Sequence, residues 1–374
     1  MNKSRQSNFE LMRIISMIFI VMWHFLYHGG LFEKSVGVTN YLSVILYALL
    51  IIHVNSFVLL TGYFNHDKSF KLSKIVKLNN SMWFYKVLIL VLFIIFTSMP
   101  FTKSFIIKTV SPIPRFNDYW FIVLYIILYL ISPALNLVIE NGGKDKHKKI
   151  IVALLIISFL ALITENEFIF GVNGGFSLFS FILLYFIGAY LHKYPIEKTK
   201  LFRAKNKKKI ILISFLLYAF LALINCILYL IGRGHTESSN FIIGHISRIF
   251  IDGFSAYSNP LIIAESVFYF VIFSQLNFKN RFINLVSKNV LGVYLITENF
   301  ILRPWIYNYL GYDLEQYSIV YLGLAIIYSL GIFGVCVSFE MLRSLVFKFF
   351  YDRKISGKLR DKIKKLFKKV NINW

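Results

Sequence analysis

Residues 10–25, ELMRIISMIFIVMWHF, decide the class of this protein. The stretch is apolar enough to begin a membrane span, which needs about 20 predominantly apolar residues. It nevertheless contains Arg13 and His24, two side chains that are costly to place in lipid. The sequence therefore predicts a membrane helix whose polar groups need either a structural partner or a function.

Further apolar segments follow along the whole chain. Counting the first one, the predicted spans lie near 11–28, 40–64, 82–100, 118–140, 150–164, 176–193, 210–232, 257–276, 289–309 and 317–347. With the N-terminus inside, most of the 41 lysines and arginines fall on the cytoplasmic side, which is the positive-inside pattern. We therefore expect an all-α polytopic membrane protein with about ten transmembrane helices and both termini in the cytoplasm.

The composition agrees with this class and excludes another. Hydrophobic residues make up 57% of the 374 residues and charged residues only 16%. The net charge of +23 would suggest nucleic-acid binding in a soluble protein. Here the cations lie in short runs between apolar segments, where they fix topology, so we expect no nucleic-acid partner. Cys226 and Cys336 fall inside apolar segments and are expected to pack as small hydrophobes.

The chain is expected to form one membrane domain, because no connection is long enough for a separate globular domain. We assign residues 1–347 to this domain and residues 348–374 to a basic cytoplasmic tail. The tail spaces apolar residues at helical intervals among lysines. It is expected either to lie as an amphipathic helix on anionic membrane lipids or to be a solvated tail.

Arg13 and His24 are expected to share one face of their helix. Eleven residues at about 100° each return the second side chain to within roughly 20° of the first, about 16 Å farther along the axis. One interpretation is structural, with Arg13 at the interface and His24 in an interhelical contact. The other is chemical: Arg13 could hold a phosphate of a carrier such as coenzyme A, and His24 could act as general base on a hydroxyl.

Several segments resemble a known family. NFELMRIISMIFIVMWH (8–24) is similar to the opening signature of the acyltransferase-3 family, integral membrane acyltransferases in which ten residues separate an arginine from a histidine at the first span. The resemblance extends in order along most of residues 8–345. Its other segments are VNSFVLLTGYF (54–64), YWFIVLYIILYLISPALN (119–136), LLYFIGAYLHKY (183–194), YSNPLIIAESVFYF (257–270) and SKNVLGVYLITENFILRPWI (287–306).

This resemblance implies a ten-helix enzyme in a bacterial cell membrane. Such an enzyme takes an acyl group, usually acetyl, from cytoplasmic acyl-CoA and transfers it to a hydroxyl of a cell-surface or lipid-linked glycan. By position, His24 is implied as the catalytic residue and Arg13 as its partner in acyl-CoA binding or site organisation. Two positions depart from the family: Thr297 stands where a histidine is common, and lysines replace its arginine-rich stretch, namely Lys68, Lys71, Lys74 and Lys77.

Glu298 is the third candidate for the catalytic group. It lies about nine residues into its predicted span, roughly 14 Å deep, a depth comparable to that of His24. It could orient or stabilise the imidazole of His24, or form a salt bridge with a neighbour such as Arg303. Lys71 and Lys74 could bind the phosphates of acetyl-CoA together with Arg13, or could serve only as topology determinants.

Five residues are candidates for binding the acceptor: Asn55, Tyr119, Trp120, Asn259 and Asn299. Asn55 has an interhelical hydrogen bond as its structural alternative, and the two aromatics have a place in the interfacial aromatic belt. Asn259 and Pro260 predict a break in a helix, where freed backbone groups can line a cavity.

The predicted function is membrane O-acetyl transfer with acetyl-CoA as donor and without a metal. The expected partners are the glycan acceptor, membrane lipids and proteins of a polysaccharide assembly pathway. Capsular or exopolysaccharide units are the preferred acceptors, ahead of peptidoglycan, teichoic acid and lipid-anchored glycan. A transporter or flippase of a lipid-linked glycan remains the alternative, because it would also use many spans and buried charges.

Overall fold

A computed structural model describes residues 5–97, 101–113, 115–199, 202–203, 206–236, 238–308 and 318–354. These residues form α-helices and two short 3₁₀ turns, with no strand among them, so the all-α prediction is confirmed. The helices are α1 (Ser7–His28), α2 (Leu31–Lys34), α3 (Gly37–Leu50), α4 (His53–Asn65), α5 (Leu72–Phe96), α6 (Lys103–Val110), α7 (Phe116–Asn141), α8 (Gly143–Ile163), α9 (Leu178–Lys193), α10 (Lys207–Gly234), α11 (Phe241–Ser255), α12 (Pro260–Ser274), α13 (Arg281–Ser287), α14 (Val290–Thr297), α15 (Arg303–Asn308) and α16 (Ile319–Lys354). The predicted tail helix beyond Lys354 lies outside the described residues.

Seven helical stretches of the described chain are long and apolar enough to cross a membrane. They are Ser7–His28, Gly37–Asn65, Leu72–Phe96, Asp118–Asn141, Lys207–Gly234, Phe241–Ser274 and Ile319–Phe347. The prediction of a multi-pass membrane protein is thereby confirmed. The count of ten spans and the cytoplasmic position of both termini stay predictions.

Prolines lie beside two of the helix breaks at the predicted spans. Asn259 caps α12 by accepting a hydrogen bond from the backbone N–H of Leu261, and Pro260 is the first residue of that helix. The predicted span 289–309 is not one helix, because α14 ends at Thr297 and α15 begins at Arg303. Pro304 has no N–H with which to continue a helical ladder across this gap. The gap leaves Glu298 and Asn299 in a non-helical segment.

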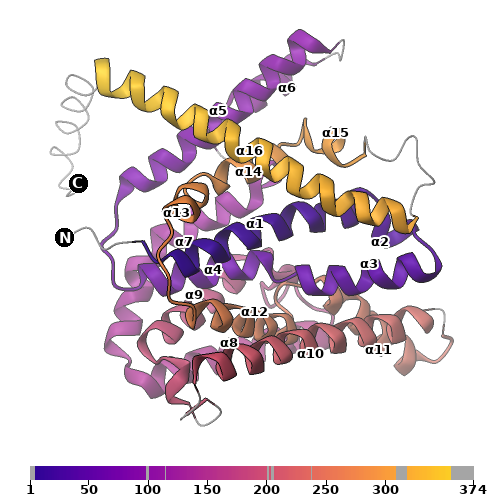
Figure 1. Cartoon of the computed structure of the whole chain (residues 1–374). Helices are drawn as coiled ribbons and strands as arrows, with labels where there is room; N and C mark the ends of the chain where they lie inside the picture. Colours follow the sequence, from indigo (N-terminus) through magenta and orange to yellow (C-terminus); the bar gives the residue numbers. More distant parts are fainter. Residues whose placement is uncertain are drawn as a thin grey trace.

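Helix α1 occupies the middle of the bundle. Figure 1 shows it in indigo between the long C-terminal helix α16 and the pair α3 and α4, while α12, α10 and α11 lie on the far side of that pair. Helix α5 crosses α16 obliquely, and α6 packs along α5 with its Phe105 ring against that of Phe300, centres 5.5 Å apart. This placement lets α1 present its side chains to several other helices at once, among them α4, α12, α13, α14 and α16.

Helices α4 and α9 pack closely through two glycines. A Cβ atom on Gly62 would lie 2.2 Å from the carbonyl oxygen of Tyr185, and one on Gly188 would lie 2.1 Å from that of Leu59. Both distances are far below van der Waals contact, so neither position accepts a side chain without moving a backbone. Small residues allow such close packing in membrane helices. The α4 face that borders the cavity described below is held in this way.

Candidate active site

One face of α1 lines a large cavity. Its volume is about 1350 Å³, and α1 contributes Arg13, Met17, Ile20, His24 and His28 at steps of three and four residues. This is the helical spacing that places side chains on one face. Arg13 and His24 therefore border the same cavity, as the helical arithmetic predicted. We call the end at Arg13 the inner end and the end at His24 the outer end.

At the outer end, His24 faces Glu298 from the break between α14 and α15. Nδ1 of His24 lies 2.7 Å from Oε1 of Glu298, and the two side chains are only 11% and 8% exposed. This contact is not aligned as a hydrogen bond, so both atoms are buried without one. Oε2 of Glu298 lies 3.6 Å from Nη1 of Arg303, the first residue of α15. From the sequence, either His24 or Arg303 could be the partner of Glu298. In the structure Glu298 contacts both residues.

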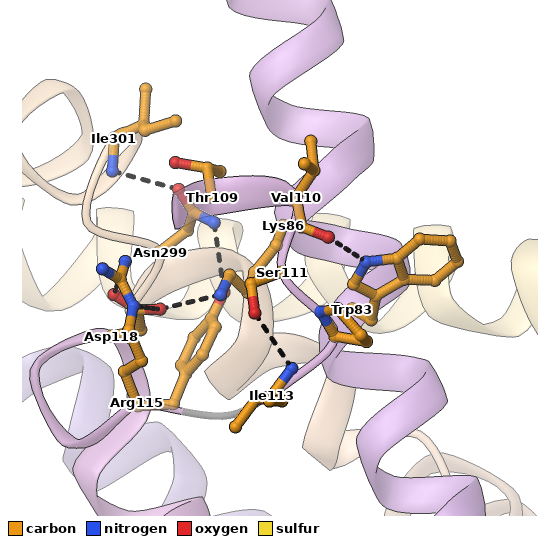
Figure 2. A network of polar contacts seen from close by, with 12 residues as sticks. Trp83, Lys86, Thr109, Val110, Ser111, Ile113, Arg115, Asp118, Asn299 and Ile301 are labelled. Atoms are coloured by element: carbon orange, nitrogen blue, oxygen red, sulfur yellow. Dashed lines mark hydrogen bonds and ion pairs between the residues drawn. The ribbon is translucent and has the colours of Figure 1, made fainter. Parts of the chain in front are cut away.

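A hydrogen-bond network fixes the segment that carries Glu298. Asn299 donates from Nδ2 to the hydroxyl of Tyr119 (3.1 Å) and accepts from the backbone N–H of Ile301 (3.0 Å), as Figure 2 shows for Asn299 and Ile301. The Tyr119 hydroxyl in turn donates to the carbonyl of Leu295 in α14 (2.7 Å). Tyr119 is therefore a brace between α7 and the broken helix. Asn299 and Tyr119 thus make hydrogen bonds within the protein. Binding of the glycan acceptor by either residue stays a prediction.

A buried ion pair lies directly before Tyr119 in the chain. Nζ of Lys86, a fully buried residue on α5, lies 2.7 Å from Oδ2 of Asp118. Arg115 also contacts Asp118, through Nη2 to Oδ1 (2.8 Å) and Nε to Oδ2 (3.1 Å), and Figure 2 shows the three residues together. A charge buried at this depth needs such partners. The ion pair ties α5 to the start of α7 and so to the brace at Tyr119.

At the inner end, Arg13 is held by an acid of its own helix. Nη1 of Arg13 lies 2.8 Å from Oε1 of Glu10, one turn earlier. Oε2 of Glu10 contacts Arg5 at 3.3 Å and accepts a hydrogen bond from the hydroxyl of Ser287 at the end of α13. The guanidinium of Arg13 also lies 5.4 Å from the ring centre of Phe64. Arg13 is thus fixed in position beside the cavity.

Basic side chains surround the inner end. The cavity is bordered there by Arg5, Arg13, Lys68, Lys74, Lys77, Lys288 and Arg343, against the acids Glu10, Asp67 and Glu340. Nζ of Lys74 lies 5.1 Å from the ring centre of Tyr129, which also lines the cavity. Lys71 is instead the N-cap residue of α5, with its backbone N–H donating to the Tyr129 hydroxyl, and it is not among the described cavity-lining residues. The structure thus brings Lys74 to the cavity and leaves Lys71 beside it.

Between the two ends the wall is mostly apolar, although Tyr125 also lines it. On α1, α7 and α14, five apolar side chains lie between a residue of the inner end and one of the outer end. They are Met17, Ile20, Ile122, Ile126 and Leu291, which we call the apolar collar. Beyond the collar the outer end is aromatic, with Trp23, Tyr27, Trp120, Phe176 and Tyr257. The rings of Trp120 and Tyr257 stack with centres 6.2 Å apart. Trp120 thus lies at the cavity, as an acceptor-binding residue would.

Two predicted acceptor residues have structural contacts away from the cavity lining. Nδ2 of Asn55 donates to the carbonyl of Tyr257 (3.0 Å), which joins α4 to the segment before α12. Nδ2 of Asn259 donates to the carbonyl of Gly253 (2.8 Å), while its Oδ1 caps α12. These contacts show how the two amides shape the wall behind Tyr257. A direct role of either residue in acceptor binding stays a prediction.

Sequence reasoning did not single out Glu10, His28 or the pair Glu340 and Arg343 as parts of the site. Glu10 and His28 could have been found by helical spacing, since they lie three residues before Arg13 and four after His24. Glu340 and Arg343 come from α16 and form a bidentate ion pair, with both N–O distances 2.6 Å. Their spacing of three residues predicts the ion pair but not its place at the cavity, because tertiary packing alone brings α16 there.

A helical membrane protein with a histidine and a carboxylate deep in a cavity that is basic at its other end has the arrangement expected of a membrane group-transfer enzyme. The comparison with protein families agrees. The model of the acyltransferase-3 family, described as an acyltransferase domain, matches residues 6–341, so the chain belongs to this family and is a membrane acyltransferase. Neither curated proteins nor solved structures gave a significant match.

Proposed function

We propose that the protein is a membrane O-acetyltransferase of a bacterial cell membrane. It moves an acetyl group from cytoplasmic acetyl-CoA to a hydroxyl of a cell-surface or lipid-linked polysaccharide. The observation that carries this proposal is the single cavity bordered by the basic cluster around Arg13 and by His24. Such a cavity can take a charged carrier at one end and perform chemistry at the other.

The donor fits the inner end and the apolar collar. Arg13, Lys74, Lys77 and Lys288 border that end and supply cationic donors for the phosphates of acetyl-CoA. The uncharged arm of the donor then extends along α1, past Met17 and Ile20. Arg13 and His24 are about 16 Å apart along the helix axis, which is the span that the arm has to cover. The thioester would thereby reach His24.

His24 acts as general base in the proposed reaction. Its Nδ1 faces Glu298, so Nε2 is the ring nitrogen left for the acceptor hydroxyl. Nε2 takes the hydroxyl proton, the oxygen attacks the thioester carbon, and the carbon–sulfur bond breaks. The proton then passes from Nε2 to the sulfur, giving coenzyme A and the O-acetyl ester. Glu298 holds the ring and stabilises the imidazolium while it carries the proton.

The aromatic outer end suits a sugar acceptor. Trp120 and Tyr257 present stacked rings at the cavity, and Tyr27 and Trp23 of α1 lie next to His24 along the chain. Aromatic faces pack against the apolar faces of sugar rings, and the polar tips of Tyr and Trp can serve the hydroxyls. Capsular or exopolysaccharide repeat units are our first choice of acceptor.

The catalytic assignment is tested by His24→Ala in the purified protein, reconstituted in lipid with labelled acetyl-CoA and isolated surface glycan. We expect ester formation to fall at least about 100-fold, the lower range for loss of a general base. His147→Ala is the matched control, because His147 is also buried but contacts the carbonyl of Phe186 (2.9 Å) outside the cavity lining. Full transfer by the inserted His24→Ala protein would refute the assignment.

The acceptor is tested in cells by NMR of purified surface glycan with and without the gene. We expect an O-acetyl signal that disappears with the gene and returns with the intact gene but not with the His24→Ala gene. A flippase would give another result, namely glycan retained inside the cell. Unchanged ester content after loss of the gene would overturn the proposed acceptor.

A further inference from the structure

A third polar side chain joins the pair at the outer end. His28 lies one turn beyond His24 on α1, and the centres of the two imidazole rings are 5.2 Å apart. One ring nitrogen of each histidine and one carboxylate oxygen of Glu298 all lie within 4.8 Å of one another. Among the described residues, these three side chains form the cluster of histidine, cysteine or acidic residues that is compact enough to bind one metal ion. The proposed acetyl transfer makes no use of His28.

The donor set has a defined chemistry. Two imidazoles and one carboxylate are a ligand set used for catalytic zinc, with a fourth position left open. Zinc–ligand distances of about 2.0–2.2 Å place two ligand atoms of a tetrahedral ion roughly 3.3 Å apart. The contact between His24 and Glu298 is 2.7 Å and no pair of the three atoms is farther apart than 4.8 Å. A tetrahedral ion would therefore need the first pair to open by about 0.6 Å and the widest pair to close by at most about 1.5 Å. Histidines four residues apart on one helix are also the spacing of helical zinc sites.

The polar atoms at this place lack other partners. Nδ1 of His24 and Oε1 of Glu298 are both buried, and their mutual contact is not aligned as a hydrogen bond. An ion between them would satisfy both atoms. The other carboxylate oxygen, Oε2, lies 3.6 Å from Nη1 of Arg303, so a carboxylate that binds metal through Oε1 keeps a second contact that orients it. The positive charge of Arg303 opposes a cation and is expected to weaken its binding.

We propose that His24, His28 and Glu298 bind one transition-metal ion of the zinc type, and that this ion inhibits the acetyl transfer. A bound ion would occupy lone pairs of the catalytic pair and exclude the acceptor hydroxyl from His24. Magnesium and calcium would not serve, because they prefer sites made of oxygen ligands. The inhibition rests on the proposed function, whereas the binding of the ion does not.

Binding is tested by titrating the purified, metal-free protein with Co²⁺, whose visible absorption reports a nitrogen- and oxygen-ligated site, and then displacing it with Zn²⁺. We expect one ion per chain in the wild type. His28→Ala and Glu298→Gln should each weaken binding at least about tenfold, since loss even of an outer-shell partner costs 10–100-fold. His245→Ala is the matched control: Nδ1 of His245 lies 2.6 Å from Oε1 of Glu165, but among the described residues this pair is not part of a three-ligand group. Its titration should equal that of the wild type.

A further variant tests whether the positive charge of Arg303 weakens metal binding. Arg303→Gln removes the opposing charge and should tighten Co²⁺ binding several-fold. Absent binding in the wild type, or equal binding by wild type and His28→Ala, would overturn the proposed site. Weaker binding by Arg303→Gln would also contradict the proposed ligand arrangement.

Inhibition is measured separately on acetyl transfer by each variant relative to its own metal-free rate. Zn²⁺ should inhibit the wild type at the concentration at which it displaces Co²⁺, and His28→Ala should need at least about ten times more. Occupied sites without inhibition would overturn the inhibitory role. A protein that binds Co²⁺ as described but transfers no acetyl group with or without metal would refute the proposed function and leave the metal site intact.

Discussion

Each end of the cavity pairs a basic side chain of α1 with a glutamate, but the two pairs differ in how well they are satisfied. At the inner end, Arg13 contacts Glu10 of its own helix, and Glu10 also has Arg5 and Ser287 as partners. At the outer end, His24 contacts Glu298 from a broken helix, without hydrogen-bond alignment. A satisfied pair holds a charge in place for binding. A pair that is close but unsatisfied can still change its partners, as a proton transfer requires.

The largest expected effect comes from breaking the outer pair. Glu298→Gln keeps the shape of the side chain but removes the charge that stabilises the His24 imidazolium. We expect kcat to fall by about 10²–10⁴-fold, the range for loss of a general acid–base function, with little change in KM for acetyl-CoA. Steady-state kinetics of the reconstituted protein measures both parameters. A rise in donor KM at unchanged kcat would place Glu298 in donor binding instead.

The next effect comes from the ion pair behind the outer end. Lys86→Met leaves Asp118 with Arg115 alone, and breaking one partner of a buried pair costs about 3–5 kcal/mol of stability. Thermal unfolding in detergent should detect the loss, and kcat should fall as the brace at Tyr119 loosens. The double variant Lys86→Met with Asp118→Leu should recover part of the stability, because the buried carboxylate is gone and the partly exposed Arg115 can be hydrated. Equal instability of single and double variants would contradict this role of the pair.

Substitution of Arg13 or Glu10 at the inner end should weaken donor binding and leave the chemical step unchanged. Arg13→Ala removes one charge-assisted contact, worth about 1.5–3 kcal/mol, so KM for acetyl-CoA should rise about 10–100-fold. Arg13→Lys should recover only part of this, because lysine cannot make the bidentate contact. Glu10→Gln should raise the same KM by a smaller factor, through loss of the contact that fixes Arg13. A loss of kcat alone in Arg13→Ala would contradict the division of labour between the two ends.

The smallest expected effect on donor binding distinguishes Lys74 from Lys71, two lysines for which the sequence predicts the same role. Lys74→Ala should raise KM for acetyl-CoA a few-fold, within the about 0.2–1 kcal/mol typical of exposed charge contacts, and the effect should shrink in high salt. Lys71→Ala should leave KM unchanged, since Lys71 caps α5 and does not line the cavity. Equal effects of the two variants would show that the donor reaches beyond the cavity described here.

Local patterns predicted much of the fold, because spans and same-face residues depend on composition and helical periodicity. The apolar segments fall on helices, and Arg13 and His24 border one cavity as predicted. The span 289–309 was predicted as continuous because its apolar residues outweigh Glu298 and Asn299, yet Pro304 and the side-chain contacts of Asn299 favour a break. The apolar content of a segment therefore predicts that it enters the membrane, but not where its helix is interrupted.

The site itself was predictable only in part. Helical spacing links Arg13 to Glu10 and His24 to His28, so those neighbours follow from the sequence alone. The contact of His24 with Glu298 joins residues 274 positions apart, and the brace from Tyr119 to Asn299 joins α7 to the broken helix. Such contacts depend on how helices pack. A single sequence therefore offers several partners for each buried charge without choosing among them.

The apolar collar also bears on the barrier function of the membrane. A passage from a basic inner end to a polar outer end would be a route for ions if it were wet along its length. Met17, Ile20, Ile122, Ile126 and Leu291 line its middle with apolar side chains, beside which a hydrated ion gains no polar contact. The middle of the cavity therefore suits an uncharged chain better than a salt ion, so the same apolar side chains that accept such a chain also oppose ion leakage across a membrane.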